Sequence, residues 1–500
     1  MKKRLLSILL LTAMLLGVAC GAAFSTGAAG KPGDVDNDDD VTIIDVTLIQ
    51  RHLADVITLD EAAQKRGMVA GDDELTIIDA TLIQRYIADV ITRFPVEDIL
   101  PTEAPTAAPT QAPTSAPTQA PTEAPDEVTK VKDNITIYFS NNKNWSKVNA
   151  YIYNDKTGAA MKAWPGTTMT NYTTNTYGEK VYSMTVNAAQ YNRVIFNNGS
   201  AQTTDTPLTK ASSGYFINGT SNGKQLAGLY PYGQSGEGTI ETVTMDYPDG
   251  YKKKVYVWLP EGYNAADKSK KYPVLYMCDG QNLFGQATTL SGYEWECDET
   301  ALSLMQNGGD GVIIVGVACG DTSARRNHEL TPNLGQLSSV VSGDASYRNG
   351  GGKVFSDFVV DTVMPYVEGK YNTNSIRGVA GSSSGGIEAF YIGMEHPDKF
   401  RYIGALSPAF ILYNKDVWDN YLSAKSFTGE LPRVYFFCGN SANDQLEQAL
   451  YPNATAMEGW MKNHGYPAEK MITVTDADAT HSEAFWALYF PEMLSWGLEL

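Results

Sequence analysis

The fold of the C-terminal half of this 500-residue chain is decided by the segment Gly378-Val379-Ala380-Gly381-Ser382-Ser383-Ser384-Gly385-Gly386-Ile387. Residues 381–385 have the pattern G-x-S-x-G. The residues before it have strand character, and residues 386–394 have the composition of a helix. A strand, a tight turn and a helix are the context in which this pattern exposes a serine nucleophile. We therefore predict that Ser383 is a nucleophile, with a Ser/Gly-rich loop as the alternative.

Strands and helices alternate around this segment, through residues 238–500. The apolar runs 255–258, 274–277, 312–315 and 434–437 read as buried strands, and helical stretches separate them. This alternation is typical of an α/β fold around a mostly parallel sheet. Ligands of such sheets bind at the carboxyl ends of the strands.

The partners of the serine are expected later in the chain, because this motif is followed by an acid and then by a histidine. His481 follows the last apolar strand and opens the loop before the last helix, so it is the predicted general base. His328 precedes the serine, while His396 and His464 lie at expected helix ends.

The predicted acid follows the strand 434–437. Asp444 is our first choice and Glu447 is the alternative. Asp444 has a competing interpretation, because aspartate is a preferred N-cap residue of helices.

Four stretches distributed over this domain have a more specific pattern than the serine motif alone: YPVLYMCDGQNLF, RNHELTP, GVAGSSSGG and THSEAFW. The domain resembles the esterase D-like family of α/β-hydrolases, which includes enterochelin, feruloyl and acetyl esterases. The resemblance implies an ester substrate and an oxyanion hole made by the backbone N–H groups of Gln281 and Ser384. It implies no metal for the chemistry. Relatives often carry a glutamate earlier in the acid loop, where this chain has Ser441 and Ala442.

An internal repeat lies near the N-terminus. Residues 41–58 read VTIIDVTLIQRHLADVIT and residues 75–92 read LTIIDATLIQRYIADVIT, so 14 of 18 positions agree at an offset of 34. The loop before the first copy begins at residue 34 and carries carboxylates at its positions 1, 3, 5 and 12, the spacing of an EF-hand-type calcium loop. The predicted ligands are the side chains of Asp34, Asp36, Asp38 and Asp45 and the backbone carbonyl of Asp40.

Residues 31–97 resemble a type I dockerin, which implies structural Ca²⁺ and a cohesin domain of a scaffold protein as partner. The second loop departs from the pattern, because Met68 and Ala70 stand where acids are expected. Asp72 and Asp79 remain in register. We therefore predict one tight calcium site, with the second weak or empty.

Residues 129–229 are rich in Tyr, Thr, Asn and Gly, and short alternating runs between turn residues predict a β-sandwich. The stretches WSKVNAYIYN, AWPG and YNRVIFNNGSAQT resemble a starch-binding module of carbohydrate-binding family 26. The resemblance implies an aromatic platform under an α-glucan, made by Tyr151, Tyr153 and Trp164, with Gln202 binding sugar hydroxyls. The competing interpretation is that these aromatic side chains are core.

The remaining segments concern export. Residues 1–25 have the basic start, short apolar run and small residues of a secretory signal peptide. Residues 98–128 repeat a proline at about every fourth position, which is typical of an extended linker. The formal charge of −19 argues against a nucleic-acid partner, and the mature chain offers no membrane span.

Together these features predict a multidomain protein: a small α-helical dockerin with calcium loops, a β-sandwich carbohydrate-binding module and an α/β-hydrolase domain. The predicted function is a secreted serine esterase that acts on esterified carbohydrate, docked to a scaffold and targeted to starch. The alternatives are a non-catalytic polysaccharide-binding protein with a decayed hydrolase domain, and a feruloyl or acetyl-xylan esterase of the plant cell wall.

Overall fold

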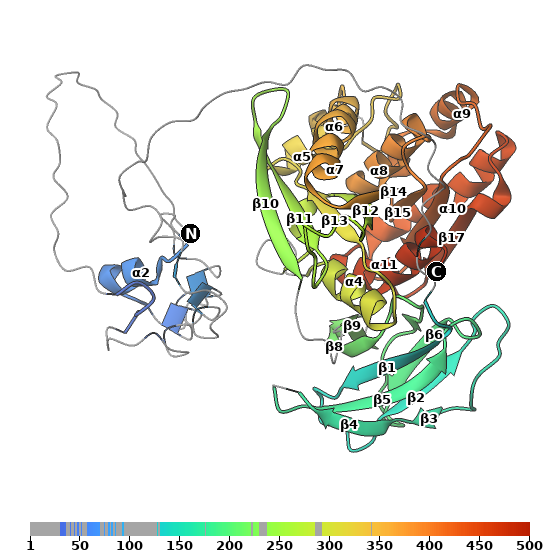
Figure 1. The fold of residues 1–500 in the computed structure, drawn as a ribbon. Helices are drawn as coiled ribbons and strands as arrows, with labels where there is room; N and C mark the ends of the chain where they lie inside the picture. The colour runs from blue at the N-terminus through green and yellow to red at the C-terminus, as the bar shows by residue number, and fades with distance from the viewer. Residues whose placement is uncertain are drawn as a thin grey trace, which may run out of the picture. The chain divides into compact units, whose positions relative to one another are not determined.

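The protein was analysed as a computed structural model. It describes residues 131–500 apart from 176, 222–223, 230–237, 286–292 and 342, and a discontinuous set of residues between 31 and 128. The predicted signal peptide and residues 98–127 of the predicted linker lie outside this set. The chain divides into two compact units, residues 1–118 and 119–500 (Figure 1). Within the described residues, we find no helix with the length and apolarity that a membrane crossing requires.

The C-terminal half is built on one eight-stranded sheet of order β10-β11-β13-β12-β14-β15-β16-β17. The strands from β13 to β17 in this order are parallel to one another, and β10 and β11 are antiparallel additions at one edge. The central strands are buried along their whole length, as expected of a sheet covered on both faces. Their bounds are β10 Thr239–Asp246, β11 Lys252–Leu259, β12 Tyr272–Cys278, β13 Ile313–Val317, β14 Thr373–Ser382, β15 Tyr402–Leu406, β16 Arg433–Gly439 and β17 Met471–Asp476.

Helices cover both faces of this sheet, and each face has its own apolar cluster. Side chains of α6, α7, α8 and α10 belong to one cluster, and those of α4 and α11 belong to the other. This confirms the predicted α/β-hydrolase architecture. The helix bounds are α4 Cys297–Gln306, α5 Ser323–Glu329, α6 Gly352–Phe358, α7 Met364–Lys370, α8 Ser384–Glu395, α9 Lys415–Ser423, α10 Gln445–Asn463 and α11 Glu483–Leu498.

Residues 131–229 form the predicted β-sandwich. One sheet has the order β4-β5-β1-β8-β9 and the other has the order β3-β2-β6-β7. Alternate residues of β1 and β2 face the apolar core between the sheets, including Ile137, Phe139, Ala150 and Ile152. The strand bounds are β1 Asn134–Ser140, β2 Asn149–Tyr153, β3 Thr167–Thr168, β4 Thr170–Thr174, β5 Lys180–Asn187, β6 Arg193–Asn197, β7 Thr206–Pro207, β8 Gly214–Ser221 and β9 Lys224–Leu229.

The sandwich packs directly on the α/β domain (Figure 1). Its core residues belong to the same apolar cluster as those of α4 and α11. Polar contacts reinforce the junction: Arg193 of β6 lies 3.0 Å from Glu492 of α11, and Asn307 donates to the carbonyls of Lys210 and Ser212. A shared apolar core joins the sandwich to the α/β domain.

The described part of the N-terminal unit has a small core of its own. It contains α2, Glu61–Gly67, which begins at the N-cap Asp60. The buried side chains include Val35 and Val69, and Ile49 and Ile83. Each pair is separated by 34 residues, so both copies of the repeat contribute equivalent positions to one core.

Candidate active site

Ser383 stands on a strained turn between β14 and α8. Its backbone has φ 57° and ψ −123°, a conformation that costs energy for any residue except glycine. A Cβ at Gly381 would lie 2.4 Å from the carbonyl oxygen of Gly385, and one at Gly385 would lie 2.8 Å from Asp279. Gly381 is therefore required by close backbone packing, and Gly385 by the close approach of the Asp279 side chain.

The turn exposes one serine of the three. Ser383 is partly accessible, whereas Ser382 and Ser384 are buried. The backbone of Ser383 is fixed by its neighbours, because its N–H donates to Leu406 at 3.0 Å and its carbonyl accepts from Ala409 at 2.9 Å. The accessible hydroxyl is thus held at the carboxyl end of β14.

His481 lies in the loop between β17 and α11, with its Nδ1 2.7 Å from Oε2 of Glu447. The Glu447 side chain is fully buried in the first turn of α10, just after β16. A carboxylate can only accept this hydrogen bond, so the proton is on Nδ1 and the lone pair is on Nε2. That tautomer is the one a general base needs.

The prediction that Asp444 contacts the imidazole is wrong for this structure. Asp444 is the N-cap of α10, and its Oδ1 accepts from the N–H groups of Leu446 and Glu447 at 3.0 Å. Its Oδ2 accepts the backbone N–H of His481 at 2.7 Å. The helix geometry explains the difference, because the N-cap side chain turns back to the first amides while the N3 side chain projects past them.

Further hydrogen bonds hold the Glu447 carboxylate. Its Oε1 accepts from Ser407 Oγ at 2.5 Å and from the N–H of Gly439 at 2.6 Å. Trp486 Nε1 donates to Ser407 Oγ at 3.0 Å, and the Trp486 ring meets the His481 ring edge to face at 5.0 Å. Sequence reasoning missed Ser407 and Trp486, although Ser407 directly follows a predicted strand and Trp486 lies in the THSEAFW stretch.

The two residues predicted to form the oxyanion hole lie just after the neighbouring strands β12 and β14. Ser384 is the first residue of α8, so its N–H has no acceptor within the helix. Gln281 lies in the short 3₁₀ helix η2, Gly280–Asn282, which follows β12. Asp279, just before η2, has φ 56° and ψ 48°.

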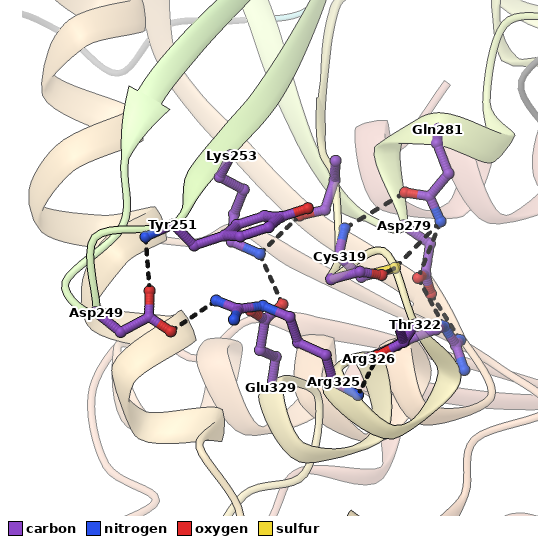
Figure 2. A network of polar contacts seen from close by, with 12 residues as sticks. Asp249, Tyr251, Lys253, Asp279, Gln281, Cys319, Thr322, Arg325, Arg326 and Glu329 are labelled. Atoms are coloured by element: carbon purple, nitrogen blue, oxygen red, sulfur yellow. Dashed lines mark hydrogen bonds and ion pairs between the residues drawn. The ribbon is translucent and has the colours of Figure 1, made fainter. Parts of the chain in front are cut away.

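A buried ion pair anchors the η2 turn, and sequence reasoning missed it. Arg326 of α5 donates from two nitrogens to the two oxygens of Asp279, each at 2.8 Å (Figure 2). Burial opposes the charge of Asp279, but the attraction of Arg326 and its hydrogen bonds outweigh it and lower the pKa of the carboxyl. A bidentate pair of this kind fixes orientation as well as charge. The RNHELTP stretch, which contains Arg326, was the available signal.

Helix α5 is fixed by a second network at its other side (Figure 2). Glu329 accepts from Arg325 at 2.9 Å and from the buried Lys253 at 2.7 Å. The Arg325 guanidinium lies 4.0 Å from the centre of the Tyr251 ring and also reaches Asp249 at 2.6 Å. These contacts tie α5, and through Arg326 the η2 turn, to the edge of the sheet.

The other histidines of the domain are engaged elsewhere. His396 lies 3.4 Å from Ser356 Oγ, and His464 lies 3.2 Å from Asp419. His328 packs at Gly351, whose N–H donates to the His328 carbonyl at 2.7 Å.

The predicted sugar platform is assembled on the outer face of the four-stranded sheet. The rings of Tyr151 and Tyr153 stack at 5.2 Å, and the Trp164 ring meets Tyr151 at 5.5 Å with an interplanar angle of 64°. Trp164 is 49% exposed. Asn197 lies two residues from Ile195, the cross-strand partner of Tyr151, so Asn197 and Tyr151 share one face of the sheet. Gln202 pairs with Asn197 and therefore lies on that face as well.

The turn that carries Trp164 needs a glycine. Gly166 has φ 91°, and a Cβ there would lie 2.2 Å from the carbonyl oxygen of Ala150. Asn197 Nδ2 donates to the carbonyl of Pro165 at 2.9 Å. These contacts seat the turn on β2 and hold the indole beside the two tyrosines.

The first loop of the repeat brings its described acids together. Ligand oxygens of Asp34, Asp36 and Asp45 lie within 4.8 Å of one another, and Asp34 and Asp45 are buried. Three carboxylates with this spacing fit a hard cation such as Ca²⁺. Asp38, Asp40 and Asp72, which we also predicted as ligands, lie outside the described residues.

The two loops share one hydrogen-bond pattern. Asp45 Oδ1 accepts from the N–H groups of Val35 and Asp36 at 2.6 and 3.2 Å, and Asp79 Oδ1 accepts from those of Val69 and Ala70 at 2.8 and 2.9 Å. At these described residues the second loop therefore keeps the hydrogen bonds of the first, although Met68 and Ala70 supply no carboxylate.

Three family models match successive parts of the chain. Residues 250–496 match the family described as "Putative esterase". The chain contains an esterase domain. Residues 137–207 match "Starch-binding module 26", and residues 32–88 match "Dockerin type I domain". The predicted family resemblances are confirmed, and so is the multidomain fold class.

The esterase chain is also similar to solved structures at low identity. An IroE-like serine hydrolase from Shewanella oneidensis is 20% identical, with 52% of this chain and 79% of that chain covered and a TM-score of 0.40. The enterobactin esterase FES from Shigella flexneri is 14% identical over 74% of this chain and 94% of that chain, with a TM-score of 0.41. The siderophore hydrolase EstA from Aspergillus nidulans is 18% identical, with 53% of this chain and 97% of that chain covered and a TM-score of 0.42.

Proposed function

We propose that this esterase is a serine hydrolase with the triad Ser383, His481 and Glu447. The observation that carries the proposal is the 2.7 Å contact between His481 Nδ1 and Glu447 Oε2, at the same end of the sheet as the partly accessible Ser383. The three residues follow β14, β17 and β16, so they converge at the carboxyl ends of neighbouring parallel strands.

The mechanism follows from these positions. His481 Nε2 removes the proton of Ser383 Oγ as this oxygen attacks the ester carbonyl, and Glu447 stabilises the imidazolium that forms. The backbone N–H groups of Gln281 and Ser384 receive the oxyanion. His481 then protonates the leaving alcohol, and activates a water molecule that hydrolyses the acyl-enzyme.

We infer that the alcohol part of the substrate is a sugar of starch or a related α-glucan. The starch-binding module and the esterase domain share one apolar core, so a glucan held by the module stays near the catalytic domain. The platform of Tyr151, Tyr153 and Trp164 suits the apolar face of a pyranose, and Gln202 suits its hydroxyl groups.

The dockerin supports a scaffold-bound, exported enzyme. The partner is a cohesin domain, and Ca²⁺ held by Asp34, Asp36 and Asp45, with the predicted Asp38 and Asp40, supplies folding energy to the small domain. Secretion is supported by the predicted signal peptide at residues 1–25.

An ester screen tests the function. Acetyl, butyryl and feruloyl esters of starch and of xylan are incubated with the protein and with the matched variant Ser383→Ala, and the released acid is measured. We expect release from a starch ester by the wild type alone. Release from xylan esters only would contradict the starch assignment, and no release from any ester would favour a decayed hydrolase domain.

A further inference from the structure

The exposed aromatic rings of the described chain are concentrated in the starch-binding module. Trp164, Tyr172 and Tyr177 are 49%, 55% and 75% exposed, and they are the aromatic members of the exposed large hydrophobic set among the described residues. Trp164 belongs to the platform already described. Tyr172 belongs to β4 of the other sheet and Tyr177 lies in the turn between β4 and β5, and neither has a role in the platform.

The strand register places the rings of Tyr138 and Tyr172 on one face. In β1, Ile137 and Phe139 point into the core, so Tyr138 and Ser140 point outward. The Tyr138 ring lies 5.3 Å from the Tyr172 ring of β4. The outer face of the five-stranded sheet therefore carries a pair of neighbouring tyrosines.

An open pocket adjoins the outward residues of β1. Its volume is about 320 Å³, and it is lined by Ser140, Asn142, Asn175, Tyr177, Glu179 and Phe216. Phe216 of β8 faces outward as well, because Phe139 pairs with the inward Tyr215. A Cβ at Gly228 would lie 2.5 Å from the Phe216 ring, so this glycine lets the ring lie flat against β9.

The polar side chains of the pocket are held in place by the fold. Asn142 Nδ2 donates to the carbonyl of Ile217 at 2.8 Å, and Asn142 Oδ1 accepts from its N–H at 3.3 Å. Asn175 Nδ2 donates to Glu179 Oε2 at 2.8 Å. Fixed side chains lose little conformational entropy when a ligand binds.

The chemistry of the lining selects a neutral, hydroxyl-rich ligand with apolar faces. Two aromatic rings offer flat apolar surfaces, while the amide, hydroxyl and carboxylate groups offer hydrogen bonds to alcohols. Lysine and arginine are absent from the lining, which argues against an anionic ligand, and four polar residues out of six argue against a purely apolar one. An oligosaccharide meets these requirements.

We propose that this face, defined by Tyr138, Tyr172 and the adjoining pocket lined by Tyr177 and Phe216, is a second α-glucan site. It rests on the proposed starch-binding function and extends it. The two sheets of a sandwich present opposite outer faces about 10 Å or more apart. Two sites on opposite faces engage two glucan chains at once and increase retention on a granule by multivalency.

Titration calorimetry of the full chain with maltoheptaose tests the proposal in three proteins: the wild type, Tyr151→Ala/Trp164→Ala, and this double variant with Tyr172→Ala/Tyr177→Ala added. We expect Tyr151→Ala/Trp164→Ala, the platform variant, to keep measurable maltoheptaose binding. The variant with all four substitutions should bind at least about tenfold more weakly than the platform variant. Val340→Ala, an exposed apolar residue of the α/β domain, is the matched control and should bind like the wild type. Thermal unfolding checks that every variant is folded.

The outcomes separate the two proposals. If the platform variant alone abolishes binding, or if the tyrosine pair changes nothing in that background, the second site is overturned and starch binding at the platform stands. If the wild type does not bind maltoheptaose, the starch-binding function itself fails, and the second site fails with it.

Discussion

His481 Nδ1 lies 2.7 Å from Glu447 Oε2, and the Glu447 side chain is completely buried. A buried carboxylate is tolerated only when its oxygens are hydrogen-bonded, and here Ser407, Gly439 and His481 supply the donors. The first turn of α10 adds the positive end of a helix dipole. This arrangement fixes the orientation of the His481 imidazole.

Replacing the nucleophile should abolish turnover. Ser383→Ala is expected to lower kcat by about 10⁴- to 10⁶-fold with the fold retained, because the covalent step is lost. Steady-state kinetics and labelling with a fluorophosphonate measure this. Ser382→Ala is the neighbouring control, and equal loss of labelling in both variants would refute the assignment of Ser383.

The acid is tested by a pair of isosteric changes. Glu447→Gln should lower kcat by about 10⁴-fold, because the amide no longer stabilises the imidazolium. Asp444→Asn should keep the helix cap, because asparagine caps a helix as well as aspartate does, and should affect kcat much less. A large loss of kcat in Asp444→Asn, with kcat retained in Glu447→Gln, would assign the acid to Asp444 instead.

The platform is tested by removing its exposed indole. Trp164→Ala should weaken retention on granular starch by an amount equivalent to about 1–3 kcal/mol, the size of a typical aromatic anchor. A pull-down isotherm measures the change, and an unchanged unfolding midpoint shows that the module is intact. Undiminished retention would assign Trp164 a structural role instead.

A partly buried acid just before α4 should make stability depend on pH. Burial, followed by the nearby charge of Glu299, raises the pKa of Glu294 to about 8 from its ordinary 4.5. The folded state then holds a proton that the unfolded state releases above pH 4.5, so stability falls as the pH rises from about 4.5 to about 8. Glu294→Gln should remove this loss and raise stability by about 1–3 kcal/mol at pH 9.

Melting temperatures at pH 5 and pH 9 measure the effect. The variant should gain over the wild type at pH 9 and much less at pH 5. Glu469→Gln, at an exposed position, is the control and should follow the wild type at both values. An equal change in the melting temperature of Glu294→Gln at both pH values would contradict the expected titration of Glu294.

The calcium loops should be unequal. Calorimetry on residues 31–97 is expected to give one tight Ca²⁺ site, because the first loop supplies more carboxylates than the second. Asp34→Ala/Asp45→Ala should remove that site and unfold the domain. Two sites of similar affinity would contradict the predicted asymmetry.

Local patterns in the sequence determined much of this protein. The serine turn, the order of strands and helices, the repeat and the position of Trp164 on a Trp-Pro-Gly turn are all properties of contiguous residues, so they could be predicted. His481 could be proposed as well, because chain order argued against His328 and expected helix ends argued against His396 and His464. Each of these inferences depends on neighbours in the chain.

Only the tertiary structure decided which acid faces His481, because Asp444 and Glu447 lie three residues apart in one helical turn. The backbone amides take the N-cap side chain, and only the N3 side chain reaches across to the loop after β17. The Asp279–Arg326 pair and the junction between Arg193 and Glu492 likewise join residues 47 and 299 positions apart. Such contacts depend on how the sheet brings distant strands together, and no local pattern encodes that distance.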